Sequence, residues 1–171
     1  MLPMAHMYGL AFEFLYEFAC GCHIYFLTRM PSPKIIFQAF AEIKPRIIIA
    51  VPLIIEKIIK KNVLPKLETP TMKLLLKVPF INDKIKHTVR DQVVKAFGGN
   101  FEEVVVGGAA FNQEVEQFLK MIEFPYTVGY GMTECGPIIC YEDWKRFKAA
   151  SCGKPVPRME VKIVSPDPAN I

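Results

Sequence analysis

The sequence predicts an α/β fold, with a layered, mainly parallel sheet that carries helices on both faces. Two observations lead to this expectation. Short apolar runs that end at glycine or proline, as buried strands do, alternate several times with segments in which apolar residues recur at helical spacing. Of the 171 residues, 51% are hydrophobic and 22% are charged, a balance typical of a globular domain. We expect residues 1–171 to form a single α/β unit.

Three apolar runs are predicted to be the main strands of the sheet: Arg46–Val51, Glu103–Val106 and Tyr126–Gly129. The first has no alternation of apolar and polar residues, which indicates a strand covered by helices on both faces. Another short buried strand is expected over His23–Leu27. A half-exposed strand is expected over Pro157–Val164, where apolar and polar residues alternate.

Capping residues and apolar stripes predict the helices. Ser32, followed by Pro33, offers a hydroxyl cap and a proline at the first helical position, and Asn112 caps a second helix. The inward residues expected are Ile36, Phe40 and Ile43 in the first helix, and Val115, Phe118, Leu119 and Ile122 in the second. Further helices are expected over residues 8–20, 52–61, 72–78 and 81–97, the first of them buried and ended by Gly21.

The charge pattern argues against a nucleic-acid partner. The 21 basic and 17 acidic residues are scattered along the chain, without the concentrated basic stripe that nucleic-acid binding requires. The apolar N-terminal stretch is not expected to cross a membrane, because Glu13 and Glu17 interrupt it.

The cysteines indicate reduced thiols. Their number, five, is odd, and a chain of this size does not need disulfides, so a cytoplasmic location is expected. The run Cys20-Gly21-Cys22-His23 lacks the thiolate spacing of a zinc knuckle and a second pair of ligands. We therefore expect these side chains to pack in the core.

Both ends of the sequence differ from ordinary domain ends. Leu2 and Pro3 lead directly into an apolar stretch, and the segment 166–171 stops in a turn-like sequence. We expect a piece of a longer protein, whose uncovered apolar faces would drive self-association.

Chemistry is most concentrated in two glycine-containing loops that follow predicted strands. One loop is Gly107–Ala110, and the other is Gly129–Glu134. Ligands of open α/β sheets bind beyond the carboxyl ends of the strands, so the two loops can share one ligand. The small residues of the first loop would admit a flat ring, on which Tyr130 could stack.

The second loop also carries polar groups suited to a magnesium-nucleotide. The Thr133 hydroxyl could reach a phosphate oxygen, and the Glu134 carboxylate is a hard oxygen ligand of the kind that Mg²⁺ uses beside phosphates. Taken one at a time, these residues have plainer readings, with the glycines serving turns, Tyr130 packing in the core and Glu134 solvated. Their joint spacing after two strands favours the ligand.

The order of motifs resembles that of the AMP-forming acyl-CoA synthetases and their adenylating relatives, and it is most similar to the long-chain fatty-acid branch. Tyr130-Gly131-Met132-Thr133-Glu134 is similar to the Tyr-Gly-x-Thr-Glu signature of that family. The segments 2–9, 44–52, 107–109 and 153–163 resemble its Leu-Pro-x-x-His-x-x-Gly, Pro-to-Val-Pro, Gly-Gly-Ala and post-signature stretches.

This resemblance implies a fragment of the large N-terminal AMP-binding domain of an enzyme that uses ATP, Mg²⁺ and coenzyme A. Such an enzyme converts a fatty acid to an acyl-adenylate and then to a thioester, with AMP and pyrophosphate released. Peripheral membrane contact is compatible with such a substrate. The resemblance assigns roles as follows: Gly108, Ala109 and Ala110 line the adenine and acyl pocket, Tyr130 stacks on adenine beside Gly131 and Met132, Thr133 contacts phosphate, Glu134 binds Mg²⁺, and His6 lies near the carboxylate at the mouth of the acyl channel.

Some family features do not occur in residues 1–171. The Ser/Thr/Gly-rich phosphate loop, the ribose-binding Thr-Gly-Asp segment and the lysine of the C-terminal domain are not found, so we expect no turnover from this piece alone. Two alternatives remain open, namely a non-catalytic α/β nucleotide-binding module and an adenylation domain that loads a carrier protein. His6, as a lone histidine beside methionines, could instead be a core residue.

Overall fold

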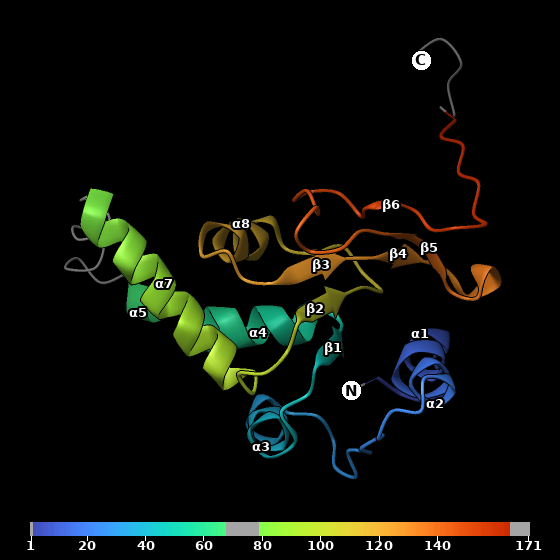
Figure 1. Cartoon of the computed structure of the whole chain (residues 1–171), viewed down its shortest axis with the longest axis horizontal. Coiled ribbons are helices and arrows are strands. Elements are labelled where there is room, and N and C mark those ends of the chain that lie inside the picture. Colours follow the sequence, from blue (N-terminus) through green and yellow to red (C-terminus); the bar gives the residue numbers. More distant parts are fainter. Residues whose placement is uncertain (1, 68–78, 165–171) are drawn as a thin grey trace.

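A parallel three-stranded sheet lies at the centre of the molecule (Figure 1). The computed structural model describes residues 2–67 and 79–164. The strands β1 (Ile47–Ala50), β2 (Glu103–Val106) and β3 (Tyr126–Val128) lie in the order β1-β2-β3. Both pairs are parallel. The prediction of an α/β fold with a parallel sheet is confirmed, as are its three main strands.

Helices occupy most of the segments where periodicity predicted them. Their bounds are α1 Met7–Leu10, the π-helical turn η1 Ala11–Leu15, α2 Tyr16–Ala19, α3 Pro33–Ile43, α4 Pro52–Asn62, α5 Leu64–Leu67, α7 Pro79–Ala96 and α8 Gln113–Met121. The two predicted caps are present, since Ser32 Oγ accepts from the Ile35 N–H at 3.4 Å and Asn112 Oδ1 accepts from the Val115 N–H at 3.2 Å. The helix predicted over residues 72–78 lies outside the described residues.

One face of the sheet forms the hydrophobic core. Alternate side chains of β1 and β2 point to this face, where they are fully or almost fully buried (Ile48, Ala50, Val104 and Val106). The covering side chains come from α3, α4, α7 and α8. Phe97, directly after α7, is fully buried, and its ring contacts the rings of Phe37, Phe40, Phe101 and Phe124 at centroid distances of 5.5 to 6.2 Å.

The opposite face of the sheet is covered more thinly. The helix that begins with α1 lies on this side, where the Tyr8 hydroxyl donates to the Val105 carbonyl at 3.3 Å. Ile47, at the start of β1, remains 43% exposed. The expectation that this strand is covered along both faces is therefore wrong at its first residue.

A second, antiparallel sheet follows β3 without a connecting helix. It contains β4 (Tyr130–Gly131), β5 (Ile138–Tyr141) and β6 (Lys154–Pro155), in the order β4-β5-β6. Only Gly129 separates β3 from β4. The chain thus runs from the parallel sheet directly into a hairpin.

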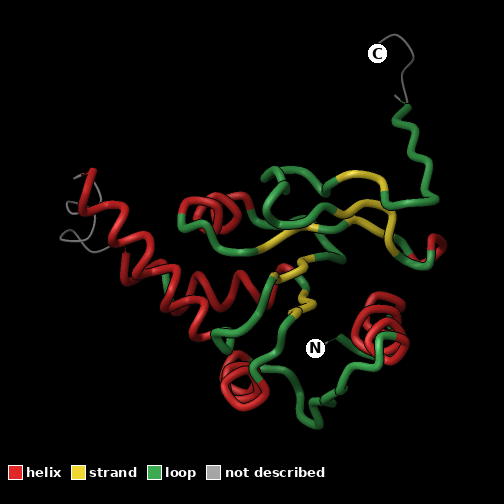
Figure 2. The backbone as a smooth tube through the Cα atoms, in the orientation of Figure 1, coloured by secondary structure: helices red, strands yellow, loops and turns green. Residues whose placement is uncertain are grey.

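Two predicted strands are not formed. His23–Leu27 has no strand partner among the described residues, and residues 158–164 form no strand and run away from the body of the molecule (Figure 2). The last strand of the described residues is β6, which pairs with β5 just before the predicted segment. An apolar run becomes a strand only where another strand can bond its backbone groups, and alternation alone does not supply that partner.

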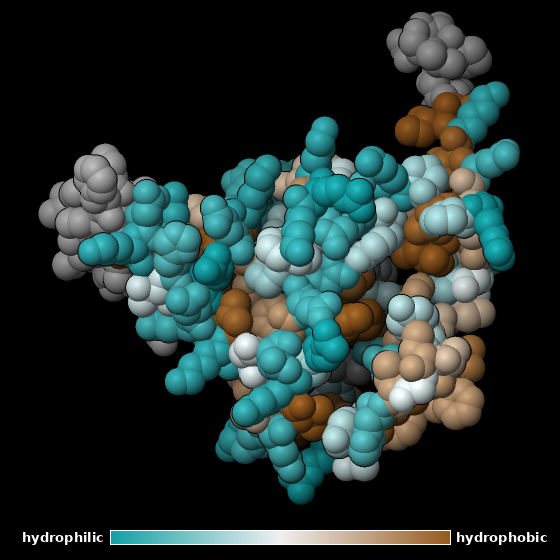
Figure 3. Space-filling model, viewed as in Figure 1, coloured by the Kyte–Doolittle hydropathy of each residue, from teal (hydrophilic) through white to brown (hydrophobic). Residues whose placement is uncertain are grey.

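The burial expected of several apolar side chains is also absent. The helix running from α1 to α2 is buried only at its start, at Tyr8 and Gly9. Leu15, Tyr16 and Phe18 are 50%, 55% and 70% exposed, so the expectation of a buried helix is wrong for its second half. Ile43, at the end of α3, is 36% exposed. Figure 3 shows apolar side chains gathered on the surface where Figure 1 places α1 and α2. Periodicity identifies a face able to be buried, but no described element covers this one.

The exposed apolar helix does not have the length of a membrane span. Within residues 2–67 and 79–164, no helix is both long enough and apolar enough to cross a bilayer.

Replacing Phe97 by alanine tests the aromatic centre of the core. Phe97→Ala should lower the free energy of unfolding by about 3 to 5 kcal/mol, because a fully buried ring leaves a cavity among four others. Urea denaturation followed by circular dichroism measures the loss. The matched control is Phe18→Ala, whose ring is 70% exposed and whose loss should cost less than about 1 kcal/mol. Equal losses in the two variants would contradict this core.

Candidate functional site

The two glycine loops begin side by side at the carboxyl ends of β2 and β3. Val106 pairs with Val128, and the Gly129 N–H donates to the Val106 carbonyl at 2.9 Å. A Cβ placed on Gly107 would lie 3.4 Å from the Gly129 carbonyl oxygen. The predicted juxtaposition of these loops is therefore observed, at the edge of the sheet where ligands of α/β proteins bind.

The first loop presents backbone and small side chains to solvent. Gly108 has φ +87°, a conformation that glycine adopts without strain, and Gly108, Ala109 and Ala110 are all exposed. Its floor is apolar, because a Cβ on Gly108 would lie 3.7 Å from Val51 Cγ1 and 4.0 Å from Tyr8 Cδ1. A flat group could approach the backbone here without meeting a bulky side chain from this loop.

The second loop is a tight hairpin rather than an open turn. Tyr130 and Gly131 form β4, which pairs with β5, so the turn itself spans residues 132–137. The Met132 N–H donates to the Pro137 carbonyl at 2.8 Å, and the turn contains a short 3₁₀ helix, η2 (Thr133–Cys135). The prediction of a loop over Gly129–Glu134 is wrong at Tyr130 and Gly131, because backbone pairing with β5 makes these two residues a strand.

The side chains predicted to hold the nucleotide are accessible. Tyr130 is 51% exposed and Met132 is 43% exposed, and Thr133 and Glu134 are also exposed. Tyr130 therefore does not pack in the core, as one plainer reading supposed. An exposed ring, hydroxyl and carboxylate follow one another along the hairpin and remain free to meet a ligand.

His6 lies at the start of α1 and is exposed, so the reading of it as a core residue is wrong. Its Nδ1 accepts from the Tyr8 N–H at 3.2 Å, which makes the imidazole the cap of the helix. This contact leaves Nε2 available for another partner. His6 bonds Tyr8, whose ring lies against the first loop.

Tyr8 is the site neighbour that sequence reasoning missed. A Cβ on Gly107 would lie 3.1 Å from the Tyr8 hydroxyl oxygen, so the phenol lies directly against that loop. Burial raises the pKa of Tyr8 above its ordinary value, and the nearby Glu13 carboxylate adds to the effect. The residue stood inside the Leu-Pro-x-x-His-x-x-Gly segment, but sequence alone gave it no role distinct from packing.

The residues of both loops that were predicted to bind the nucleotide are exposed. Two hollows of the described surface lie elsewhere, one between the first half of α7 and the end of α8 and one, of about 300 Å³, beside the amino ends of β1 and β2. Neither contains a predicted site residue.

The described chain has no cluster of three or more His, Cys, Asp or Glu side chains able to hold a metal. A single carboxylate such as Glu134 fits a magnesium ion that takes most of its ligands from phosphates and water. Cys20, Cys22 and His23 form no metal cluster and are exposed, so the expectation that they pack in the core is wrong. They lie where the first helix ends at the surface.

Comparison with known proteins shows the family of the chain. A family model described as "AMP-binding enzyme" matches residues 1–170. The chain belongs to the AMP-binding enzyme family. Long-chain-fatty-acid–CoA ligase 3 of Saccharomyces cerevisiae is 26% identical over 176 residues, which cover 95% of this chain and 25% of the yeast protein. 4-Coumarate-CoA ligase 1 of Narcissus pseudonarcissus is 33% identical over 97 residues, or 52% of this chain and 18% of the plant protein.

A solved coenzyme A synthetase shares the fold. The o-succinylbenzoate coenzyme A synthetase of Bacillus subtilis, in complex with ATP and magnesium ion, matches with a TM-score of 0.66 and 18% identity. The match covers 96% of this chain and 28% of that chain. The present chain thus spans about a quarter of the length of the relatives that it matches along most of its own length.

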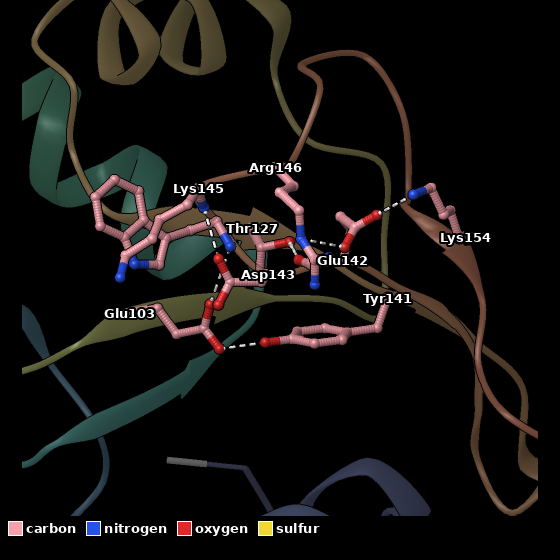
Figure 4. Close-up of polar contacts among 9 residues, drawn as sticks. Glu103, Thr127, Tyr141, Glu142, Asp143, Lys145, Arg146 and Lys154 are labelled. Atoms are coloured by element: carbon pink, nitrogen blue, oxygen red, sulfur yellow. Dashed lines mark hydrogen bonds and ion pairs between the residues drawn. The ribbon is translucent and has the colours of Figure 1, made fainter.

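Beneath the hairpin lies a network of polar contacts that the sequence did not reveal (Figure 4). Thr127 of β3 is fully buried, and its hydroxyl donates to the Glu142 carbonyl at 2.6 Å. Glu103 of β2 accepts from the Tyr141 hydroxyl and, at 3.4 Å, from the Trp144 N–H. These contacts join residues up to 41 positions apart in sequence, and no local pattern encodes them.

The close approach within the hairpin is tested by Gly131→Ala. A Cβ at this position would lie 2.1 Å from the Pro137 carbonyl oxygen, so β4 and β5 would have to separate. We expect a loss of about 1 to 3 kcal/mol in the free energy of unfolding and faster hydrogen exchange at the Met132 amide. Met132→Ala is the control, since that side chain is 43% exposed. If both variants retained wild-type stability and exchange, the hairpin would not have this geometry.

Proposed function

We propose that this chain is part of the large nucleotide-binding domain of an AMP-forming ligase that activates a long-chain fatty acid with ATP and transfers it to coenzyme A. The observation that carries the proposal is the meeting of the small-residue loop Gly107–Ala110 with the Tyr130–Glu134 hairpin at one sheet edge. Membership of the AMP-binding enzyme family supports a nucleotide as the ligand of that edge.

The proposed roles follow from what each loop presents. Adenine lies against Gly108, Ala109 and Ala110, and the half-exposed Tyr130 ring stacks on it beside Gly131 and Met132. The Thr133 hydroxyl donates to a phosphate oxygen. Glu134 binds the Mg²⁺ ion, which when bound offsets the negative charge of the phosphates. His6, with Nε2 unused by its cap, lies near the fatty-acid carboxylate.

These residues act mainly by positioning. A carboxylate oxygen of the acid attacks the α-phosphorus, pyrophosphate leaves, and the thiol of coenzyme A then displaces AMP to give the thioester. Holding the acid and nucleotide in line removes much of the entropic barrier, and fixed donors stabilise the charge that develops on phosphate. Phosphate-binding and catalytic groups elsewhere in a longer enzyme complete the reaction.

The choice of a long-chain acid is supported by the extent of the matches. The yeast long-chain ligase matches 95% of this chain, whereas the 4-coumarate ligase matches 52%. The acceptor thiol is proposed to be that of coenzyme A, since both relatives are named as coenzyme A ligases. Transfer to a carrier-protein thiol would instead indicate the adenylation-domain alternative. A cytoplasmic location remains a prediction from the cysteine content.

Nucleotide binding by the chain itself is tested with a fluorescent AMP analogue. Tyr130→Ala should weaken binding about 5- to 150-fold, because stacking on an aromatic ring contributes about 1 to 3 kcal/mol per base. Tyr130→Phe keeps a flat ring and should bind nearly as well as the wild type. The control is Tyr25→Ala, which removes a similarly exposed tyrosine, 58% against 51%, from outside the site. An unchanged affinity in Tyr130→Ala would contradict the stacking role.

Catalysis is tested in a longer chain that supplies the phosphate loop and the C-terminal domain. That protein should catalyse fatty-acid-dependent exchange between ATP and pyrophosphate, and Glu134→Ala should reduce the rate at least about 100-fold, because a magnesium ligand beside the phosphates is lost. Glu160→Ala, which removes another exposed carboxylate, should leave the rate unchanged. The 171-residue chain alone should show no turnover. Absence of exchange with every carboxylic acid would end the proposal.

A further inference from the structure

Along the chain, only Gly129 joins the hairpin that carries Tyr130–Glu134 to β3 of the parallel sheet, and side-chain and backbone bonds add further attachments. Thr127 and Glu142 form the first attachment, in which the buried threonine hydroxyl donates to the glutamate main-chain carbonyl at 2.6 Å. Because Thr127 lies in β3 and Glu142 directly follows β5, this bond fixes the base of the hairpin. The hairpin cannot tilt away from β3 without breaking it.

The Glu142 side chain forms the second attachment. Its carboxylate is 10% exposed and forms ion pairs with Lys154 Nζ at 3.0 Å and with Arg146 Nε at 3.3 Å (Figure 4). Lys154 is the first residue of β6, the outer strand of the hairpin sheet. One residue therefore bonds β3 through its backbone and β6 through its side chain.

The chain leaves little room for β6 to move at this point. A Cβ on Gly153 would lie 2.4 Å from the Tyr141 carbonyl carbon, so the backbones before β6 and at the end of β5 are in close contact. The negative charge of Glu142 strengthens its ion pair with Lys154. Hydrogen bonding from Lys154 holds the pKa of the Glu142 carboxyl below its ordinary value. The Arg146 guanidinium and the Asp143 backbone N–H act in the same direction, and burial acts against them.

We propose that Glu142 is a positioning residue for the nucleotide site, acting through β5 and β6 to hold the Tyr130–Glu134 hairpin beside the Gly107–Ala110 loop. The proposal rests on the function proposed above for the nucleotide, but its structural part does not need the ligand. Glu142 itself touches neither loop. Its effect is to fix the angle at which the hairpin leaves the parallel sheet.

The ionised state of Glu142 makes this effect dependent on pH. The groups that face the carboxylate are Lys154, Arg146 and the Asp143 backbone N–H. A carboxyl group whose folded pKa is lowered stabilises the fold above its unfolded pKa, and that contribution is lost as the pH falls through the folded value. The hold on the hairpin should therefore be complete at neutral pH and weaken below about pH 4.5, the region of the unfolded glutamate pKa.

Glu142→Gln tests the proposal, because it keeps the shape of the side chain and removes its charge. Hydrogen exchange in the wild-type chain and the variant is compared at two amides of the hairpin sheet, Met132 and Val156, and at Gly107 of the parallel sheet. We expect exchange at the hairpin amides to accelerate on the order of tenfold, since two ion pairs are lost, and exchange at Gly107 to stay unchanged. Equal exchange at the hairpin amides in wild type and variant would overturn the proposal.

Two further variants keep the test decisive. Lys154→Gln removes one cation from an exposed position and should give a smaller acceleration at the same amides, which a fold-disrupting change would not confine to them. Glu102→Gln breaks an exposed ion pair with Arg46 and should change neither the exchange at the hairpin amides nor the exchange at Gly107. As the pH falls below about 4.5, the wild type should approach the exchange protection of Glu142→Gln. A constant ratio across this range would also overturn the proposal.

Nucleotide titration separates the two proposals. If the wild type binds the fluorescent AMP analogue and Glu142→Gln binds it several-fold more weakly, the positioning role extends to the ligand. Binding that is equal in both proteins would overturn that role. If the wild type shows no binding, the proposed function of this chain fails, and the exchange measurement still decides whether Glu142 holds the hairpin.

Discussion

The parallel register of β2 and β3 is the constraint on which the functional surface depends. Pairing of Val106 with Val128 brings the glycines that follow them to adjacent points on one edge of the sheet. A shift by one residue would turn the loops to opposite faces, because side-chain direction alternates along a strand. Burial on one face of the sheet fixes the register, since Val104 and Val106 are fully buried against the helices and a shift by one residue would expose them.

The two loops differ in how they are supported, and this suits their proposed roles. Gly107–Ala110 is backed by Tyr8 and Val51, so it provides a fixed apolar floor. The hairpin rises from β3 and depends on polar contacts made by Thr127 and Glu142. The Gly107–Ala110 loop and the hairpin together form an exposed surface, which further parts of a longer enzyme could cover when a ligand is bound.

The apolar side chains of the described residues are buried unevenly. Four helices cover one face of the parallel sheet, whereas the helix from α1 to α2 leaves Leu15, Tyr16 and Phe18 exposed. The chain spans about a quarter of the length of its long-chain ligase relatives. An apolar surface of this kind is compatible with further contacts beyond the described residues.

The sequence by itself determined the α/β class, the three parallel strands, the Ser32 and Asn112 caps and the two loops after the strands, because each is written in local periodicity or in a short motif. Local patterns could not decide whether His23–Leu27 would find a strand partner, or that β6 would lie at Lys154–Pro155. Nor could they show Tyr8 against Gly107, or Glu142 between β3 and β6. Only the tertiary structure decided these points, because hydrogen bonds and burial between residues far apart in sequence depend on which surfaces the folded chain brings together.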